Sequence, residues 1–177
     1  MLLADEARSQ RLEARRQRGG KRSAGCGVRF ARGDWRLPLV RRHLRPAPRL
    51  AAMRVLKSRI HGLIDTSDGL ATDARHLSDM SGVKILLDAD SLPIVPATNR
   101  FCVGRGTDPF GFVMGAGEDY ELLFTSSRQI PSSVGGVKVT RIGSVQKGSG
   151  LWTSSARGTL PVTVLGYDHI GASGKTC

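Results

Sequence analysis

The chain has 177 residues and a formal net charge of +12, yet residues 1–59 hold 17 of the 27 Lys and Arg residues and only 4 of the 15 Asp and Glu residues. The positive charge therefore belongs to the first third, and residues 60–177 have the nearly neutral composition of an ordinary globular domain. Three widely separated cysteines exclude a disulfide framework, and no apolar run reaches the roughly 18–20 residues of a membrane span, so we expect a cytoplasmic protein without a membrane segment.

Residues 1–37 are predicted to be a basic, disordered leader. Arg, Gly and Ser dominate residues 15–23, and apolar residues are too sparse to offset the entropy lost on ordering the chain. The rival interpretation is a nucleic-acid-binding protein, because so many cations can contact phosphates without reading sequence. Phe30 and Trp35 are the only aromatic residues in the first 59, however, so we expect nothing beyond non-specific contacts with nucleic acid.

The folded domain is predicted to span residues 38–170, with residues 171–177 as a tail. Its first part, Pro38–Arg49, contains three prolines and is expected to be an extended or turning connector. A helix is predicted from about Leu50 to Ser58, because Leu50, Met53 and Leu56 share one helical face.

A short buried strand is predicted at His61–Ile64, running directly into Asp65. Ser67 is the expected N-cap of the helix that follows. Apolar and small residues then recur at helical spacing and form a stripe along one face of that helix: Leu70, Ala74, Leu77 and Ser81. Gly82 is expected to end the helix as its C-cap.

The rest of the chain alternates strands with loops. Asp88–Pro96 is predicted to be a loop and residues 148–157 a turn region, and strands are predicted at Val83–Leu87, Tyr120–Thr125 and Val137–Gly143. Strands and helices mixed around one core indicate an α/β domain with a layered, mixed sheet.

Asp65, Ser67 and Asp68 form the first segment that suggests chemistry. A strand end that leads into a helix N-terminus is a place where phosphate groups bind, because free N–H groups and the helix dipole favour anions. The two carboxylates could hold Mg²⁺ against such a phosphate, and Ser67 could contact the same nucleotide. Ordinary capping at a helix start is the structural alternative.

A second acidic segment spans Gly115–Leu122. Gly115 and Gly117 permit a tight turn, after which Glu118 and Asp119 precede an apolar strand. Neighbouring residues of a strand face opposite sides, so these two carboxylates are expected to do different jobs. The structural alternative is a charged turn before a strand.

Taken together, the two segments resemble those of thiamine-monophosphate kinase, in its C-terminal half. The matching pieces are Arg45–Arg49 (RPAPR), Ile64–Leu70 (IDTSDGL), Gly115–Leu122 (GAGEDYEL) and Gly166–His169 (GYDH), within a region from about Leu39 to Ile170. The resemblance implies the fold of the C-terminal domain of the aminoimidazole ribonucleotide synthase superfamily. It also implies transfer of the γ-phosphoryl group of ATP to thiamine monophosphate, which gives thiamine diphosphate.

The resemblance assigns roles to five positions. Asp65 and Asp68 would be Mg²⁺ ligands, and Ser67 would contact ATP. Glu118 would contact thiamine monophosphate, and Tyr167 would pack against the cationic ring of that substrate, an arrangement that cation–π attraction favours. No role is implied for Asp73 or Asp119, which stay unassigned.

The chain also departs from the family pattern. Residues 1–37 do not resemble the family's N-terminal domain with its acidic metal ligands, and Ala116 stands where a second glycine is common. We therefore expect a half-enzyme, and three alternatives stay open: activity of this chain alone or as a homodimer, activity with a separate N-terminal half, or a catalytically inactive fragment.

Overall fold

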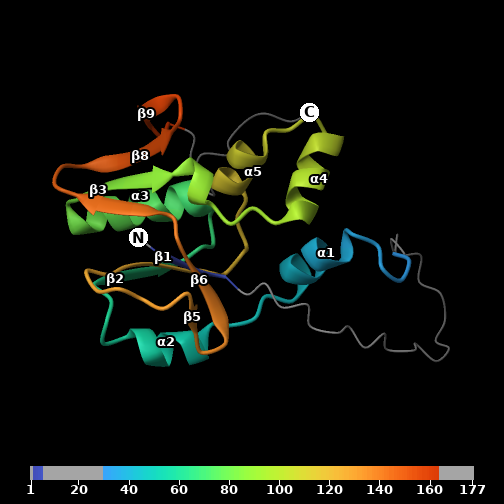
Figure 1. Cartoon of the computed structure of the whole chain (residues 1–177), viewed down its shortest axis with the longest axis horizontal. Coiled ribbons are helices and arrows are strands. Elements are labelled where there is room, and N and C mark those ends of the chain that lie inside the picture. Colours follow the sequence, from blue (N-terminus) through green and yellow to red (C-terminus); the bar gives the residue numbers. More distant parts are fainter. Residues whose placement is uncertain (1, 6–29, 164–177) are drawn as a thin grey trace, which may run out of the picture.

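A computed structural model of the chain describes residues 2–5 and 30–163, and these form two β-sheets with helices packed against them (Figure 1). The first sheet has five strands in the spatial order β2 (Gly62–Asp65), β4 (Leu122–Thr125), β1 (Leu2–Asp5), β6 (Val137–Arg141) and β5 (Ser133–Val134). The second has four, in the order β7 (Gly143–Gln146), β3 (Lys84–Asp88), β8 (Gly150–Ser155) and β9 (Gly158–Pro161). The β3–β8 pair is parallel and the other pairs are antiparallel, so the predicted mixed α/β fold is confirmed.

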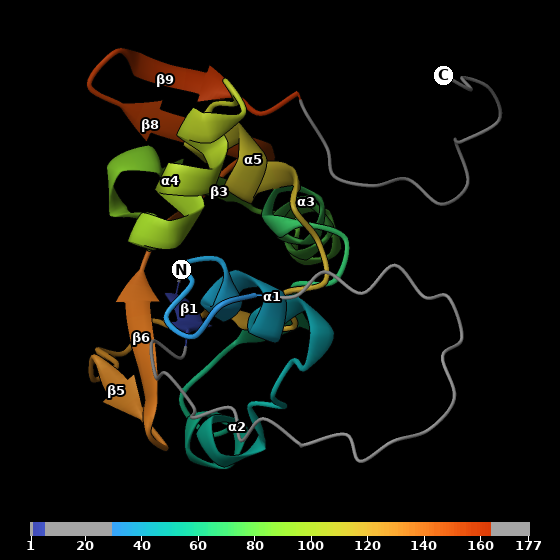
Figure 2. The same ribbon diagram turned by 90° about the vertical axis from the view of Figure 1, so that its right-hand side faces the viewer.

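Five α-helices and one short 3₁₀ helix complete the described residues: α1 (Leu37–Leu44), α2 (Leu50–Leu56), α3 (Leu70–Ser81), the 3₁₀ helix Ala89–Ser91, α4 (Pro96–Gly104) and α5 (Pro109–Gly115). Figures 1 and 2 place α2 and the four-stranded sheet at opposite ends of the domain, with the five-stranded sheet between them. Within the described residues, no helix is both long and apolar enough to cross a membrane.

Two hydrophobic clusters hold these layers together. One lies between α2 and the five-stranded sheet and includes Leu56, Phe124 and Val139. The other surrounds α3, which contacts strands of both sheets, and includes Leu77, Leu87 and Leu123. Phe124 and the preceding Leu123 belong to different clusters because successive side chains of a strand point to opposite faces.

The predicted helices at Leu50 and Leu70 are confirmed, and so is the end of α3. Gly82 has the left-handed backbone of a C-cap, with φ 61° and ψ 37°, and its N–H bonds to carbonyls of the last turn. Leu70, Ala74 and Leu77 of the predicted stripe are buried, but its fourth member, Ser81, is exposed.

Several local predictions are wrong. Pro38–Arg49 is not wholly an extended connector, because α1 occupies Leu37–Leu44 with Pro38 in its first turn, where a missing N–H removes no helical bond. The predicted turn region contains β8, whose parallel pairing with the distant β3 leaves no local signal in the sequence.

The interpretation of residues 1–37 as a leader also missed β1. Its backbone pairs antiparallel with both β4 and β6, so its four residues gain their order from strands more than a hundred positions away. Most of the predicted leader and all of the tail at 171–177 lie outside the described residues, and the boundaries of the 38–170 domain therefore stay predictions.

Candidate active site

The two acidic segments lie side by side. Asp65 at the end of β2 is paired with Leu122 at the start of β4. Beyond the strands, backbone hydrogen bonds continue from Thr66 N–H to Glu121 O (2.8 Å), from Tyr120 N–H to Thr66 O (2.9 Å) and from Glu118 N–H to Ser67 O (2.8 Å). The loop that follows β2 and the loop that precedes β4 therefore form one surface.

Two glycines permit this close approach. A Cβ at Gly117 would lie 2.5 Å from the carbonyl oxygen of Ser67, nearer than any side chain tolerates. Gly69 has a φ of 110°, and a Cβ there would lie 3.0 Å from the carbonyl oxygen of Gly115. Each loop thus uses a glycine to contact the backbone of the other.

The predicted metal ligands lie on the β2–α3 loop. Asp65 is exposed at the end of β2, and Asp68 is half-buried. Asp68 was expected in the first turn of the helix, but α3 begins two residues later, at Leu70.

Ser67 is not the N-cap that the sequence predicted. The N-cap position of α3 is Gly69, and no side chain caps it. Ser67 contributes through its backbone, because its N–H donates to Asp73 Oδ2 (2.9 Å) and its carbonyl accepts from Glu118. Its side chain is therefore not needed for capping.

Asp73, to which the sequence assigned no role, organises the β2–α3 loop. It lies in the first turn of α3 with 1 % of its surface exposed, and its Oδ2 accepts from Ser67 N–H (2.9 Å) and Asp68 N–H (3.2 Å). Burial raises the pKa of Asp73 to about 6; the hydrogen bonds from Asp68 and Ser67 oppose this rise, and the negative charges of Asp68 and Asp65 add to it. The three carboxylates are therefore close enough to interact.

The carboxylates of Asp65 and Asp68 suit a magnesium ion whose other ligands are waters and phosphate oxygens. The described residues contain no group of three or more His, Cys, Asp or Glu side chains arranged to hold a metal, so they form no closed protein cage. Mg²⁺ is commonly bound through one or two carboxylates, several waters and the phosphates of a substrate. The accessible carboxylates of Asp65 and Asp68 fit that pattern.

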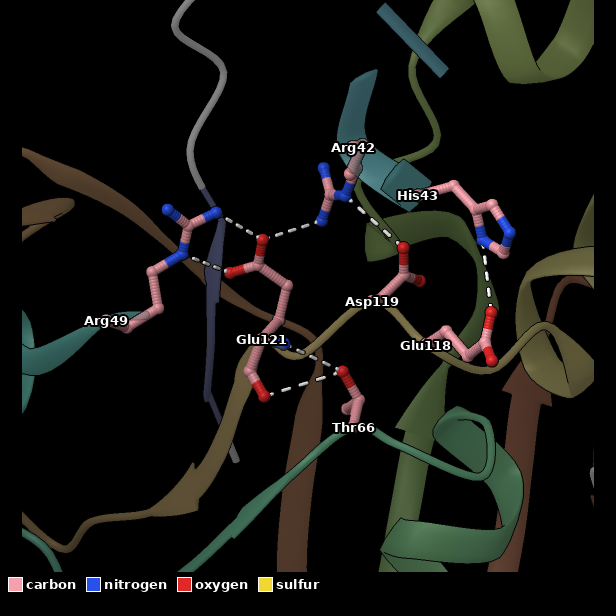
Figure 3. Close-up of polar contacts among 7 residues, drawn as sticks. All are labelled: Arg42, His43, Arg49, Thr66, Glu118, Asp119 and Glu121. Atoms are coloured by element: carbon pink, nitrogen blue, oxygen red, sulfur yellow. Dashed lines mark hydrogen bonds and ion pairs between the residues drawn. The ribbon is translucent and has the colours of Figure 1, made fainter. Parts of the chain in front are cut away.

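Glu118 and Asp119 point to different partners, as Figure 3 shows. Glu118 is exposed, with Oε2 3.2 Å from Nδ1 of His43, whereas Asp119 Oδ1 lies 3.3 Å from Nε of Arg42. Both precede β4, so the difference comes from the loop and not from the strand alternation that the sequence analysis assumed.

The backbone of this loop is strained. Glu118 has a φ of 64° and Tyr120 a φ of 50°, in the left-handed region that side chains with a Cβ disfavour. Such residues concentrate at functional sites, where the surrounding hydrogen bonds hold them. Here the bonds from Glu118 and Tyr120 to the β2–α3 loop supply that restraint.

Glu121, Arg42 and Arg49 form an ion-pair cluster that the sequence analysis did not identify (Figure 3). The Glu121 side chain is 2 % exposed and accepts from Arg49 Nε (2.8 Å), Arg49 Nη2 (2.5 Å) and Arg42 Nη2 (2.9 Å). Its backbone N–H donates to Thr66 Oγ1 at 3.1 Å. This arginine–glutamate cluster joins α1 and the start of α2 to both acidic loops.

The available signal was a glutamate inside an otherwise apolar strand segment, which indicates a buried and paired charge. Tyr167, the predicted contact of the substrate ring, and the rest of Gly166–His169 lie outside the described residues.

Two known proteins with similar sequences are both thiamine-monophosphate kinases. The chain is 33% identical over 133 residues to the thiamine-monophosphate kinase of Aquifex aeolicus, which covers 75% of this chain and 42% of that protein. It is 36% identical over 140 residues to the enzyme of Salmonella typhimurium, with 74% and 42% covered. The chain thus spans less than half the length of these relatives. No protein-family model matches it.

Solved structures give the same result. The A. aeolicus thiamine-monophosphate kinase matches with a TM-score of 0.64 and 33% identity, over 72% of this chain and 42% of that one. AaThiL complexed with AMPPCP and TMP matches with a TM-score of 0.60 and 35% identity, over 67% and 38%. HypE of E. coli, a hydrogenase maturation protein, matches at a TM-score of 0.51 and 19% identity over 63% and 38%, a likeness of fold alone. The described domain of this chain is therefore a thiamine-monophosphate kinase C-terminal-like domain, with the α/β fold of the aminoimidazole ribonucleotide synthase superfamily.

Proposed function

We propose that this domain takes part in transferring the γ-phosphoryl group of ATP to thiamine monophosphate. The observation that carries the proposal is the hydrogen-bonded contact between the two acidic loops, which brings residues 65–69 and 117–121 onto one surface. The names of the relatives support the reaction, and a similar structure that contains the ATP analogue AMPPCP together with TMP supports the two substrates.

In this proposal Asp65 and Asp68 hold Mg²⁺ and Ser67 contacts ATP. The bound ion would neutralise charge on the phosphate oxygens, because phosphoryl transfer depends on positioning and on charge stabilisation more than on covalent catalysis. Asp73 fixes the loop by accepting hydrogen bonds from the backbone N–H groups of Ser67 and Asp68. The chain's own contribution is therefore to hold two carboxylates and a hydroxyl on a restrained loop.

Glu118 is the proposed contact to thiamine monophosphate. The hydrogen bond from its backbone N–H to Ser67 O holds this residue against the first acidic loop, and its side chain, which contacts His43, is 60% exposed. An exposed carboxylate suits a positively charged substrate ring. Tyr167 stays a proposed second contact, on the resemblance of the Gly166–His169 motif alone.

The arginine–glutamate cluster holds the second acidic loop in position without contacting a ligand. Glu121 has both carboxylate oxygens bonded to arginines and is almost fully buried, so it is unsuited to bind a ligand. Its position three residues after Glu118 makes it a positioning residue for the second acidic loop.

The chain matches 42% of the length of the relatives named above, so activity of this chain alone is itself part of the proposal. A second copy of the chain in a homodimer, or a separate N-terminal half, is the proposed partner in this activity. The cytoplasm is the proposed location, on the cysteine content and the absence of a long apolar run in the sequence.

The test is conversion of thiamine monophosphate to thiamine diphosphate by the purified chain with ATP and Mg²⁺. Asp68→Asn is the test variant, and Asp79→Asn is its matched control on the far end of α3, where Asp79 pairs only with Arg75 among the described residues. Turnover that Asp68→Asn abolishes and Asp79→Asn retains is the expected result.

Two further outcomes are informative. A folded chain without turnover, which becomes active when the N-terminal half of a relative is added, would establish a half-enzyme. A folded chain that stays inactive and binds neither Mg·ATP nor thiamine monophosphate would contradict the proposal and leave an inactive fragment.

A further inference from the structure

A concave surface lies at the C-terminal end of α3, away from the acidic loops. It is an open groove of about 990 Å³, lined by the C-terminal turn of α3, the loop that follows β4, and the chain around the start of β7. Leu77 and Ser81 contribute to its wall, whereas Asp73 and Asp68 lie near the other end of the helix. At a rise of about 1.5 Å per residue, Leu77 and Ser81 lie about 10 Å and 16 Å along α3 from its first residue, Leu70, which follows the first acidic loop.

The charged and titratable residues of the groove are all bases. Arg128, Arg141 and His61 line it, and no Asp or Glu does. Neither arginine forms an ion pair with any residue in the described part of the chain; there, Arg141 makes one long hydrogen bond, from Nε to Gly143 O at 3.5 Å. Two exposed guanidinium groups without a carboxylate partner form a site that attracts anions.

Hydrogen bonds hold the loop that carries Arg128. The Ser126 hydroxyl donates to Arg59 O (2.7 Å) and accepts from Arg128 N–H (3.0 Å). Next to it, His61 Nε2 lies 2.8 Å from Ser127 Oγ, and His61 N–H donates to Thr125 O at 2.9 Å. The loop is therefore ordered before any ligand binds, which lowers the entropy cost of binding.

The groove also offers hydroxyl groups and an apolar wall. Ser127 and Ser144 are among its lining residues, and their hydroxyl groups can donate to phosphate oxygens. Leu77, Val83 and Ile130 line it as well, and all three are buried or half-buried. A ligand with a small apolar body and one strongly anionic end complements this combination.

We propose that this groove binds a phosphate-bearing small molecule. Arg128 and Arg141 contact the phosphate, and the body of the molecule packs on Leu77, Val83 and Ile130. The site shares no residue with the acidic loops and needs no divalent cation, so it stands independently of the proposed kinase activity.

The test uses the full chain in buffer that contains a metal chelator, with phenyl phosphate and inorganic phosphate as probes. Backbone amide NMR locates the binding site, and the chemical shifts give the dissociation constants. We expect saturable shifts at the amides of Ser126–Arg128 and Ser144, with tighter binding of phenyl phosphate than of inorganic phosphate. Replacing both arginines, in Arg128→Ala/Arg141→Ala, should weaken binding by about tenfold or more.

The matched control is Arg105→Ala/Arg157→Ala, which removes the same charge from exposed positions outside the groove. This control and Asp68→Asn should both bind like the unaltered chain. Equal affinity in the groove variant, shifts centred on Thr66–Gly69, or no saturable shift at millimolar probe would each overturn the proposal. Retained amide spectra of the variants exclude unfolding as the cause of lost binding.

Discussion

Arg49 binds Glu121 through two parallel hydrogen bonds, Nε to Oε2 at 2.8 Å and Nη2 to Oε1 at 2.5 Å, although the residues are 72 positions apart. Arg49 immediately precedes α2, and Glu121 immediately precedes β4, so one buried ion pair fixes the start of a helix to the second acidic loop. Planar, bidentate pairs of this kind define orientation as well as distance. The geometry of the candidate active site thus depends on the buried ion pair between Arg49 and Glu121.

Replacing Glu121 by Gln should destabilise the domain strongly. The amide removes the negative charge between Arg42 and Arg49 and leaves two cations close together, of which Arg49 is only 8% exposed. We expect a loss of about 3 kcal/mol in the free energy of unfolding, measured with urea. The matched control is Glu118→Gln, because the carboxylate of Glu118 and its partner His43 are both exposed. There we expect the free energy of unfolding to change by no more than about 0.5 kcal/mol. Equal losses in the two variants would contradict a structural role for the buried pair.

Local pattern predicted much of this fold, and non-local contacts account for what it missed. The apolar stripe from Leu70 to Leu77 and the glycine at position 82 defined α3, because a helix and its cap are determined by residues close in sequence. β8 was missed because its turn-forming Gly and Ser residues surround a strand whose partner β3 is some 65 positions away. α5 was missed because Pro109 and two glycines obscure its short apolar repeat.

The candidate site shows the same division. Asp65, Asp68 and Glu118 were predicted as site residues from their motifs and stay predictions, and the structure places the two motifs in contact. Arg42 and Arg49 were not identified, because among 17 cations in residues 1–59 nothing local distinguishes the two that pair with a distant glutamate. Asp73 was noted without a role, since accepting hydrogen bonds from Ser67 and Asp68 depends on the turn between β2 and α3.

Asp73 should make stability depend on pH between about 4 and 6. Its pKa is about 6 in the folded chain, against an ordinary value of 3.8 for an aspartate, so in this range the folded state holds more protons than the unfolded state. The stabilising contribution is therefore fully present below pH 3.8 and is lost as the pH rises through about 6. In Asp73→Asn the amide oxygen can still accept both hydrogen bonds, but the titration disappears.

The measurement is the free energy of unfolding of both chains from pH 4 to 8 without divalent ions. The difference between them should grow in favour of Asp73→Asn as the pH rises, by at most about 1.4 kcal/mol per pH unit. Parallel curves would show that Asp73 does not titrate with a raised pKa.

Glu118→Gly should separate stability from function at one position. Glycine relieves the left-handed backbone at φ 64°, so we expect the free energy of unfolding to stay constant or to rise by up to about 1 kcal/mol. Under the proposed function, binding of thiamine monophosphate should weaken, because the carboxylate is gone.

Asp119→Gly is the matched control. The φ of Asp119 is not positive and the substitution removes its ion pair with Arg42, so this variant should be destabilised by about 1 kcal/mol. Destabilisation of Glu118→Gly to the same extent would argue against strain at this residue.

A methyl group at Gly117 should disturb the candidate active site directly. The Cβ of Gly117→Ala would lie 2.5 Å from Ser67 O and 3.3 Å from the carbonyl carbon of Asp68, and both are backbone atoms that cannot rotate away. The two acidic loops must then move apart, which breaks the bond from Glu118 N–H to Ser67 O and should lower the free energy of unfolding by about 2 kcal/mol.

Gly115→Ala is a control two residues earlier, where a Cβ meets nothing within 4 Å, and there stability should stay constant or rise by about 0.5 kcal/mol. If both variants unfold at the same urea concentration, the close approach of the loops is not needed for stability; if Gly117→Ala also keeps the affinity for Mg·ATP of the unaltered chain, the loops do not act as one site.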